Sequence, residues 1–145
     1  MKVKPSPLEL VDFFVVNYQF EFVHPKEDVE IRTVFDAYPV EIDFGMRLLE
    51  DGLHQVAMKT VINRNEEQMA GYAISCEAVG IFKIQNVESE EEKQNLLVRS
   101  ALAMLLNFVR TYISTVTSHY PMGKYWLPSI DVVDLIKQRN EQAKK

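Results

Sequence analysis

Apolar side chains recur at every second position over residues 38–48, the most regular pattern in the chain. Because a period of two places alternate side chains on opposite faces of a β-strand, the segment predicts a long strand with one apolar and one polar face. Asp51-Gly52 follows it as a hairpin signal. The apolar positions are Tyr38, Val40, Ile42, Phe44, Met46 and Leu48, and those between them are Pro39, Glu41, Asp43, Gly45 and Arg47.

Three more segments alternate in the same way, so the chain predicts four strands. Residues 10–23 are apolar at nearly every position of their first half, and we expect the start of this strand to be buried on both faces. Residues 53–63 and 69–84 form the third and fourth predicted strands. Residues 24–37 hold only sparse apolar side chains, which predicts a crossover loop or a weak strand.

The apolar spacing changes to that of a helix after the fourth strand. Ser89 followed by Glu92 matches a capping box, and an acidic run suits the positive end of a helix. A long helix is therefore predicted over about 90–118. Its apolar stripe is wider than a surface helix needs, so we expect burial on two sides, with a helix of another subunit as the second partner.

A loop over 118–128 leads to a shorter helix that ends near residue 141, with Ser129 as its expected N-cap. Four strands followed by helices indicate an α+β fold. At this length we expect one domain over 1–145, with a flexible leader at 1–9 and a flexible tail at 142–145.

Composition and charge narrow the classes of function. The net charge of −5 and the scattered basic residues argue against nucleic-acid binding. One cysteine, Cys76, excludes an intramolecular disulfide and fits a cytoplasmic protein. No apolar run has the length of a signal peptide core or a membrane span, so we expect no membrane insertion.

Candidate catalytic residues are few. His24, His54 and His119 lie in separate segments without a partner at ligand or base spacing, and no glycine-rich phosphate loop is present. We expect no metal and no cofactor. Cys76 falls on an apolar strand face, which favours a core side chain over a nucleophile. An enzyme with a pocket between sheet and helix, using Cys76, His54 or Glu77, remains a disfavoured alternative.

Two groups of residues point to binding instead. Glu41 and Asp43 form part of a polar strand face, which is either solvated or a docking patch for a basic partner. Tyr125 and Trp126 lie in a predicted loop between prolines, where aromatic side chains often serve recognition although burial is their default.

Three stretches of the second half resemble one known family, the SecB protein-export chaperones. They are Cys76–Ile84 with its Gly-Ile-Phe triplet, Leu105–Ser114 with Phe108, Arg110 and Ile113 in family spacing, and Leu127–Leu135 before the last helix. The resemblance implies a four-stranded antiparallel sheet followed by a long helix and a short C-terminal helix. It also implies a homotetramer, a dimer of dimers joined through the long helices, with Leu102, Leu105, Val109 and Ile113 at the interface.

The resemblance further implies where partners bind. In the family, the second strand, the crossover and the last helix line a groove for unfolded chains, and an acidic sheet face meets the SecA motor. The matching groove positions are Phe35, Tyr38, Val40, Ile42, Phe44, Val132 and Ile136, to which we add Trp126 from its loop position. Glu21 and Glu77 are the matching motor-docking positions.

The leading hypothesis is an ATP-independent holdase for unfolded or preprotein chains, with delivery to SecA as a further expectation. The rival is a SecB-like adaptor dedicated to one partner, such as an antitoxin. Both hypotheses use exposed apolar surface for binding. Several weak sites on one oligomer would act together and raise the avidity.

Overall fold

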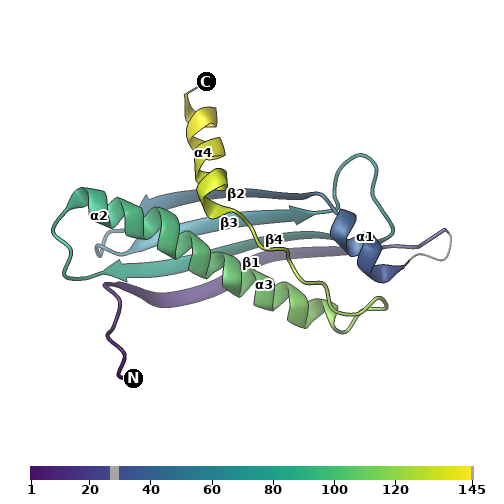
Figure 1. Ribbon diagram of the computed structural model, residues 1–145, viewed down its shortest axis with the longest axis horizontal. Coiled ribbons are helices and arrows are strands. Elements are labelled where there is room, and N and C mark those ends of the chain that lie inside the picture. The colour runs from purple at the N-terminus through teal and green to yellow at the C-terminus, as the bar shows by residue number, and fades with distance from the viewer. Residues whose placement is uncertain (27–29, 145) are drawn as a thin grey trace.

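A four-stranded antiparallel sheet and one long helix laid across it organise the chain (Figure 1). The computed structural model describes residues 1–26 and 30–144. The strand order is β1-β4-β3-β2, which makes β1 and β2 the two edges of the sheet. The predicted four strands are thus confirmed, with the bounds β1 (Leu8–Val23), β2 (Val40–Leu48), β3 (His54–Ile62) and β4 (Gly71–Ile84).

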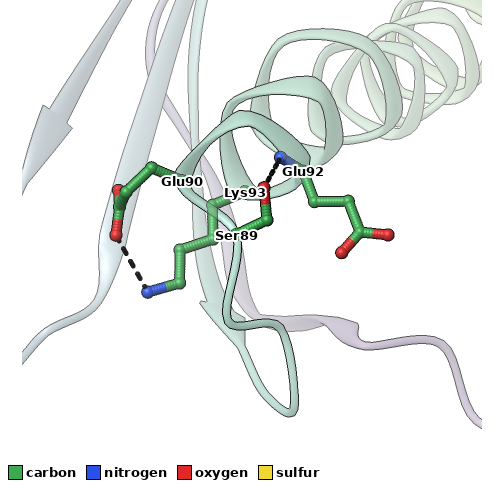
Figure 2. A network of polar contacts seen from close by, with 4 residues as sticks. All are labelled: Ser89, Glu90, Glu92 and Lys93. Atoms are coloured by element: carbon green, nitrogen blue, oxygen red, sulfur yellow. Dashed lines mark hydrogen bonds and ion pairs between the residues drawn. The ribbon is translucent and has the colours of Figure 1, made fainter.

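The long helix is continuous from Glu90 to Thr117, close to the span that the sequence predicts. It consists of α2 (Glu90–Asn95), a π-helical segment η1 (Leu96–Ala101) and α3 (Leu102–Thr117). The Oγ atom of Ser89 accepts a hydrogen bond from the backbone N–H of Glu92 at 3.4 Å, and Lys93 pairs with Glu90 at 3.3 Å (Figure 2). The cap and the acidic first turn together fix where this helix begins.

The core lies between the sheet and the long helix. Its sheet side is formed by alternate residues of β3 and β4, including Val56, Ile74 and Phe82, none of which is exposed. By length and apolar composition the helix could cross a membrane. Its apolar side chains are packed on the sheet of the same chain, however, which is the arrangement of a core helix in a soluble protein.

Two bulges in β1 change which of its side chains are buried. The register with β4 shifts between Leu10 and Asp12 and again between Val15 and Asn17. The inserted residues Val11 and Val16 are 49% and 56% exposed. The expectation that the start of this strand is buried on both faces is therefore wrong. The long helix covers one face, and among the described residues no helix crosses the other (Figure 1).

The connections also differ from the prediction at two places. Part of the segment predicted as a crossover loop or weak strand is a helix, α1 (Ile31–Ala37), while residues 27–29 of that prediction lie outside the described residues. The last helix, α4 (Val132–Ala143), is capped by Asp131, whose Oδ1 accepts the N–H of Asp134 at 3.0 Å. Ser129 is therefore not the cap.

Candidate functional site

Two tyrosine hydroxyls fix the crossover and the last loop to the start of β4. The Oη of Tyr38 donates to the carbonyl of Ala70 at 2.6 Å and accepts the N–H of Tyr72 at 3.0 Å. The Oη of Tyr72 in turn donates to the carbonyl of Gly123 at 2.8 Å and accepts the N–H of Met122 at 2.9 Å. The C-terminal end of the crossover and the last loop are thus both tied by hydrogen bonds to the start of β4.

Arg110 of α3 fixes the residues that lead into α4. Its Nε donates to the carbonyl of Leu127 at 2.9 Å, its Nη2 to the carbonyl of Pro128 at 3.1 Å, and its Nη1 to Oδ1 of Asn107 at 2.6 Å. Because a guanidinium holds its donors in a rigid fork, these bonds set the direction in which the chain leaves the helix layer. From there α4 crosses β2 at a steep angle and projects beyond that edge of the sheet (Figure 1).

A cleft of about 510 Å³ separates β2 from α4, and we call it the β2–α4 cleft. Its apolar walls come from alternate β2 residues and from the start of α4. Three carboxylates and no basic side chain line it. The complete lining is Val40, Glu41, Ile42, Ser129, Ile130, Asp131, Asp134, Leu135, Gln138 and Gln142.

An ion pair joins β2 and α4 next to this cleft. Nη1 of Arg139, on α4, lies 3.0 Å from Oδ1 of Asp43, on β2. The guanidinium carbon also lies 5.8 Å from the centre of the Phe44 ring, within the range of a cation–π contact. Beyond this pair, on the uncovered sheet face, lies a second hollow of about 330 Å³ whose lining includes Val16 and Glu77.

Of the predicted groove residues, Val40 and Ile42 line this cleft, and Phe44 lines the small hollow next to it. Val40, Ile42 and Phe44 are half-buried on β2, and Val132 and Ile136 are half-buried on α4. Their side chains pack at the edge of the main core, so binding a further apolar chain would complete their burial. Trp126 is 59% exposed, and the Nζ of Lys124 lies 5.3 Å from its ring centre.

The two aromatic residues of the crossover are placed differently. Tyr38 is only 6% exposed, and its hydroxyl already has two backbone partners. Phe35 is half-buried, with ring centres 5.4 Å from Tyr72 and 5.3 Å from Tyr125. Tyr38 therefore holds the backbone around the site in place and does not present a binding surface. Tyr125 belongs to the core, whereas its neighbour Trp126 lies on the surface.

The predicted interface residues of the long helix are not available to another subunit. Leu102, Leu105, Val109 and Ile113 are all 0% exposed because they pack on the sheet of their own chain. This part of the prediction does not fit the structure. The apolar stripe of the long helix is wide because the helix contacts both its own sheet, β1 aromatic residues included, and the last loop. The stacking of Phe13 on Phe108, with ring centres 4.8 Å apart, is one such contact.

The predicted docking carboxylates lie on the uncovered sheet face. Glu21 is exposed near the end of β1, and Glu77 pairs with Lys59 across β3 and β4 at 3.8 Å. Phe14, 41% exposed, lies on the same face. The sequence did not single out Phe14 as a surface residue, and only the bulges in β1 bring it and its apolar neighbours to the surface.

Cys76 is confirmed as a core side chain. It is 0% exposed, and burial raises the pKa of its thiol to about 11, so the thiol stays protonated at neutral pH. Its cross-strand neighbours Tyr18 and Thr60 each bury a hydroxyl oxygen that has no hydrogen-bond partner. Over the residues with described positions, no three His, Cys, Asp or Glu side chains are grouped to hold a metal ion.

Comparisons with known proteins agree on one family. The model of the family described as SecB, preprotein translocase subunit, matches residues 4–143. A protein-export protein SecB from Parvibaculum lavamentivorans is 21% identical over 136 residues, covering 94% of this chain and 80% of the relative. The solved structure of the Mycobacterium tuberculosis SecB-like chaperone Rv1957, in complex with a ChAD peptide from the HigA1 antitoxin, superposes with a TM-score of 0.61. That match has 16% identity and covers 85% of this chain and 90% of the other, so it shows a shared fold.

Proposed function

Because this chain belongs to the SecB family, we propose that it is an ATP-independent holdase that binds unfolded or preprotein chains in the β2–α4 cleft. SecB chaperones are a non-enzymatic family. The observation that carries the proposal is the cleft itself, an opening of about 510 Å³ between a half-buried apolar strand and a helix that has no fully buried residue. We expect the chain to act in the cytoplasm.

The cleft suits an unfolded chain for two physical reasons. Burying apolar side chains there gains about 25 cal/mol for each Å² removed from water, without demanding one sequence. The carboxylates of Glu41, Asp131 and Asp134 attract basic client residues and keep the empty cleft hydrated. Trp126 extends the apolar surface near the start of α4.

We also propose that the chain assembles into a homotetramer built as a dimer of dimers. β1 supports this, because it is a 16-residue edge strand whose backbone groups on one side have no strand partner within the subunit. Contacts between long helices would use their outward face, where Ser100, Asn107 and Thr111 are exposed. Assembly would multiply the clefts and raise the avidity for long unfolded chains.

Delivery of clients to SecA is a further part of the proposal, with Glu21 and Glu77 on the uncovered sheet face as the docking residues. The M. tuberculosis relative is described with a peptide from an antitoxin, which raises the alternative of one dedicated partner. We propose a general holdase, because the cleft offers apolar and carboxylate groups without a deep, shaped pocket.

The test dilutes two unfolded proteins of opposite charge, reduced lysozyme and reduced α-lactalbumin, into buffer with and without this protein. We expect light scattering from both to fall at stoichiometric amounts. Ile42→Asp, inside the cleft, should abolish the effect, while Leu48→Asp serves as the matched control because Leu48 is 66% exposed on the same strand outside the cleft. Unchanged scattering with the wild-type protein would exclude a general holdase and leave the dedicated adaptor.

A further inference from the structure

The outward face of the long helix carries exposed side chains without charge. Asn107, Thr111 and Thr115 are exposed on α3 and follow one another at four-residue intervals, which places them on one face. Charged residues make up 26% of the chain, yet the only one in α3 is Arg110. Depletion of charge is typical of the centre of a protein–protein interface and unusual for a helix face that stays in water.

A second copy of this chain is the partner that fits this face. Hydroxyl and amide groups both donate and accept hydrogen bonds, so one patch of them can face itself across a two-fold axis. A patch of lysines or glutamates would instead repel its own copy. The side chains of Asn107, Thr111 and Thr115 therefore give the proposed contact between long helices a physical basis.

Asn107 is also connected inwards, to its own subunit. Its Oδ1 accepts a hydrogen bond from Nη1 of Arg110 at 2.6 Å, and its backbone carbonyl accepts one from Oγ1 of Thr111 at 3.0 Å. Because Oδ1 is engaged within the subunit, the amide N–H groups are the part of this side chain that can donate to a neighbouring copy. Asn107 thus lies between the outward face and Arg110.

The guanidinium of Arg110 carries this connection to the wall of the β2–α4 cleft. Its Nε donates to the carbonyl of Leu127 at 2.9 Å, and its Nη2 donates to the carbonyl of Pro128 at 3.1 Å. The cleft lining begins with the next residue, Ser129, and continues through residue 131. Since the donors of a planar guanidinium have fixed relative directions, restraining Nη1 also restrains Nε and Nη2 and the carbonyls that they hold.

Water weakens the outer part of this connection in a separate subunit. The bond between Asn107 and Arg110 is solvent-exposed, whereas the bond from Arg110 to Leu127 is partly buried. A hydrogen bond becomes electrostatically stronger when water is excluded and the local dielectric falls. A second copy packed on Asn107 would exclude that water, and would so tighten the hold on the chain that leads into the cleft wall.

We propose that Asn107 and Arg110 are positioning residues for client binding, through which a second copy packed on the long helix sets the wall of the β2–α4 cleft. The inference rests on the proposed function and adds a dependence of each cleft on assembly. Neither residue lines the cleft. The effect differs from avidity, because one cleft of the assembly binds more tightly than the same cleft in a separate subunit.

The affinity of single clefts tests the proposal by fluorescence anisotropy. The probe is a capped, fluorescein-labelled eight-residue peptide of leucine, serine and two lysines. A stoichiometry of one peptide per subunit, measured in the same titration, excludes avidity. Asn107→Ala removes one hydrogen bond and should bind the probe about two- to tenfold more weakly, at protein concentrations where light scattering gives the wild-type mass.

Thr115→Ala is the matched control on the same helix face. It should bind the probe like the wild type, because the bonds of Arg110 go to Asn107, Leu127 and Pro128. Asn107→Asp keeps an acceptor for Nη1 and should bind the probe more tightly than Asn107→Ala does, since a carboxylate bonds a guanidinium more strongly than an amide does. Circular dichroism verifies that each variant is folded.

A second variant tests the dependence on assembly. Thr115→Glu places an unpaired charge on the outward face, so it should lower the native mass. The separated subunits should bind the probe about two- to fivefold more weakly, and the loss caused by Asn107→Ala should be smaller in this background.

The only tryptophan of the chain reports on the same segment independently. Trp126 directly precedes Leu127, whose carbonyl Arg110 holds. Acrylamide should therefore quench the fluorescence of Trp126 more strongly in Asn107→Ala and in Thr115→Glu than in the wild type. Thr115→Ala should be quenched like the wild type.

The outcomes distinguish this inference from the proposed function. Wild-type affinity in Asn107→Ala would overturn the positioning role. A Thr115→Glu variant that keeps the wild-type mass, or that separates and still binds with wild-type affinity, would overturn the dependence on assembly. If any of these results occurs while the wild-type protein suppresses aggregation of unfolded proteins, the holdase stands and this inference falls. If the wild type neither binds the probe nor suppresses aggregation, both fall.

Discussion

Removing one hydroxyl group, in the variant Tyr38→Phe, tests whether Tyr38 supports the site rather than forming it. The hydroxyl lies at the C-terminal end of the crossover helix and bonds the carbonyl of Ala70 at 2.6 Å and the N–H of Tyr72 at 3.0 Å. Tyr72 is 0% exposed, so its N–H would lose its partner without gaining water. A net hydrogen bond contributes about 1 kcal/mol, and an unsatisfied buried donor costs about 1–3 kcal/mol.

We therefore expect Tyr38→Phe to lower the free energy of unfolding by about 2–3 kcal/mol, measured by urea denaturation. Tyr120→Phe is the matched control, because the Tyr120 ring stacks on Phe20 at 3.8 Å and its hydroxyl makes no described hydrogen bond. At temperatures where the variant is fully folded, its suppression of client aggregation should equal that of the wild type. A variant as stable as the wild type that no longer suppresses aggregation would refute the reasoning and restore Tyr38 as a binding residue.

Three further predictions concern backbone strain, helix capping and ionisation. Gly71→Ala should lower the free energy of unfolding by at least about 2 kcal/mol in urea denaturation, since φ is +108° and the new methyl group would meet the Tyr38 hydroxyl. Gly123→Ala, at φ +79°, places its methyl group in open space and should lower it by about 1 kcal/mol. Ser89→Ala should lower the free energy of unfolding by about 0.5–1 kcal/mol, and with it the melting temperature, because the helix loses its cap. The loss is at the low end for a cap because the hydrogen bond is long, at 3.4 Å. Burial raises the pKa of Cys76 from 9.0 to about 11, so the folded state holds its proton where the unfolded state loses it, and the urea midpoint should fall between pH 9 and pH 11. Cys76→Ala should flatten part of that fall, and an unchanged slope in the variant would show that other groups, such as the buried tyrosines, account for it.

The long helix and the strands could be predicted because local periodicity determines them. The helix α1 has only seven residues, with no side-chain N-cap and no acidic residue in its first turn. Its sequence therefore gives no signal that predicts a helix. Likewise, alternation shows that Phe14 and Val16 share an apolar strand segment, but it cannot show that no layer covers them. Coverage depends on where the helix crosses the sheet, which is a property of the whole fold.

The sequence predicts the β2 portion of the candidate site but not the side-chain contacts that link distant parts of the chain there. Alternation placed Ile42 and Phe44 on one face of a strand, which is confirmed by their shared packing against the core. The Arg139–Asp43 pair joins residues 96 positions apart, and the Tyr38 hydroxyl reaches a carbonyl 32 positions away. No local pattern encodes such pairings, so the sequence places Tyr38 among the groove residues and does not reveal the Arg139–Asp43 pair.

Hydrogen–deuterium exchange with and without a bound unfolded client tests the central claim most directly, because it reports each strand separately. If clients occupy the β2–α4 cleft, amide exchange should slow in residues 40–48 and 130–143 while β1 changes little. Slowed exchange confined to β1 and β4, with 40–48 unchanged, would contradict the account and place the client on the uncovered sheet face.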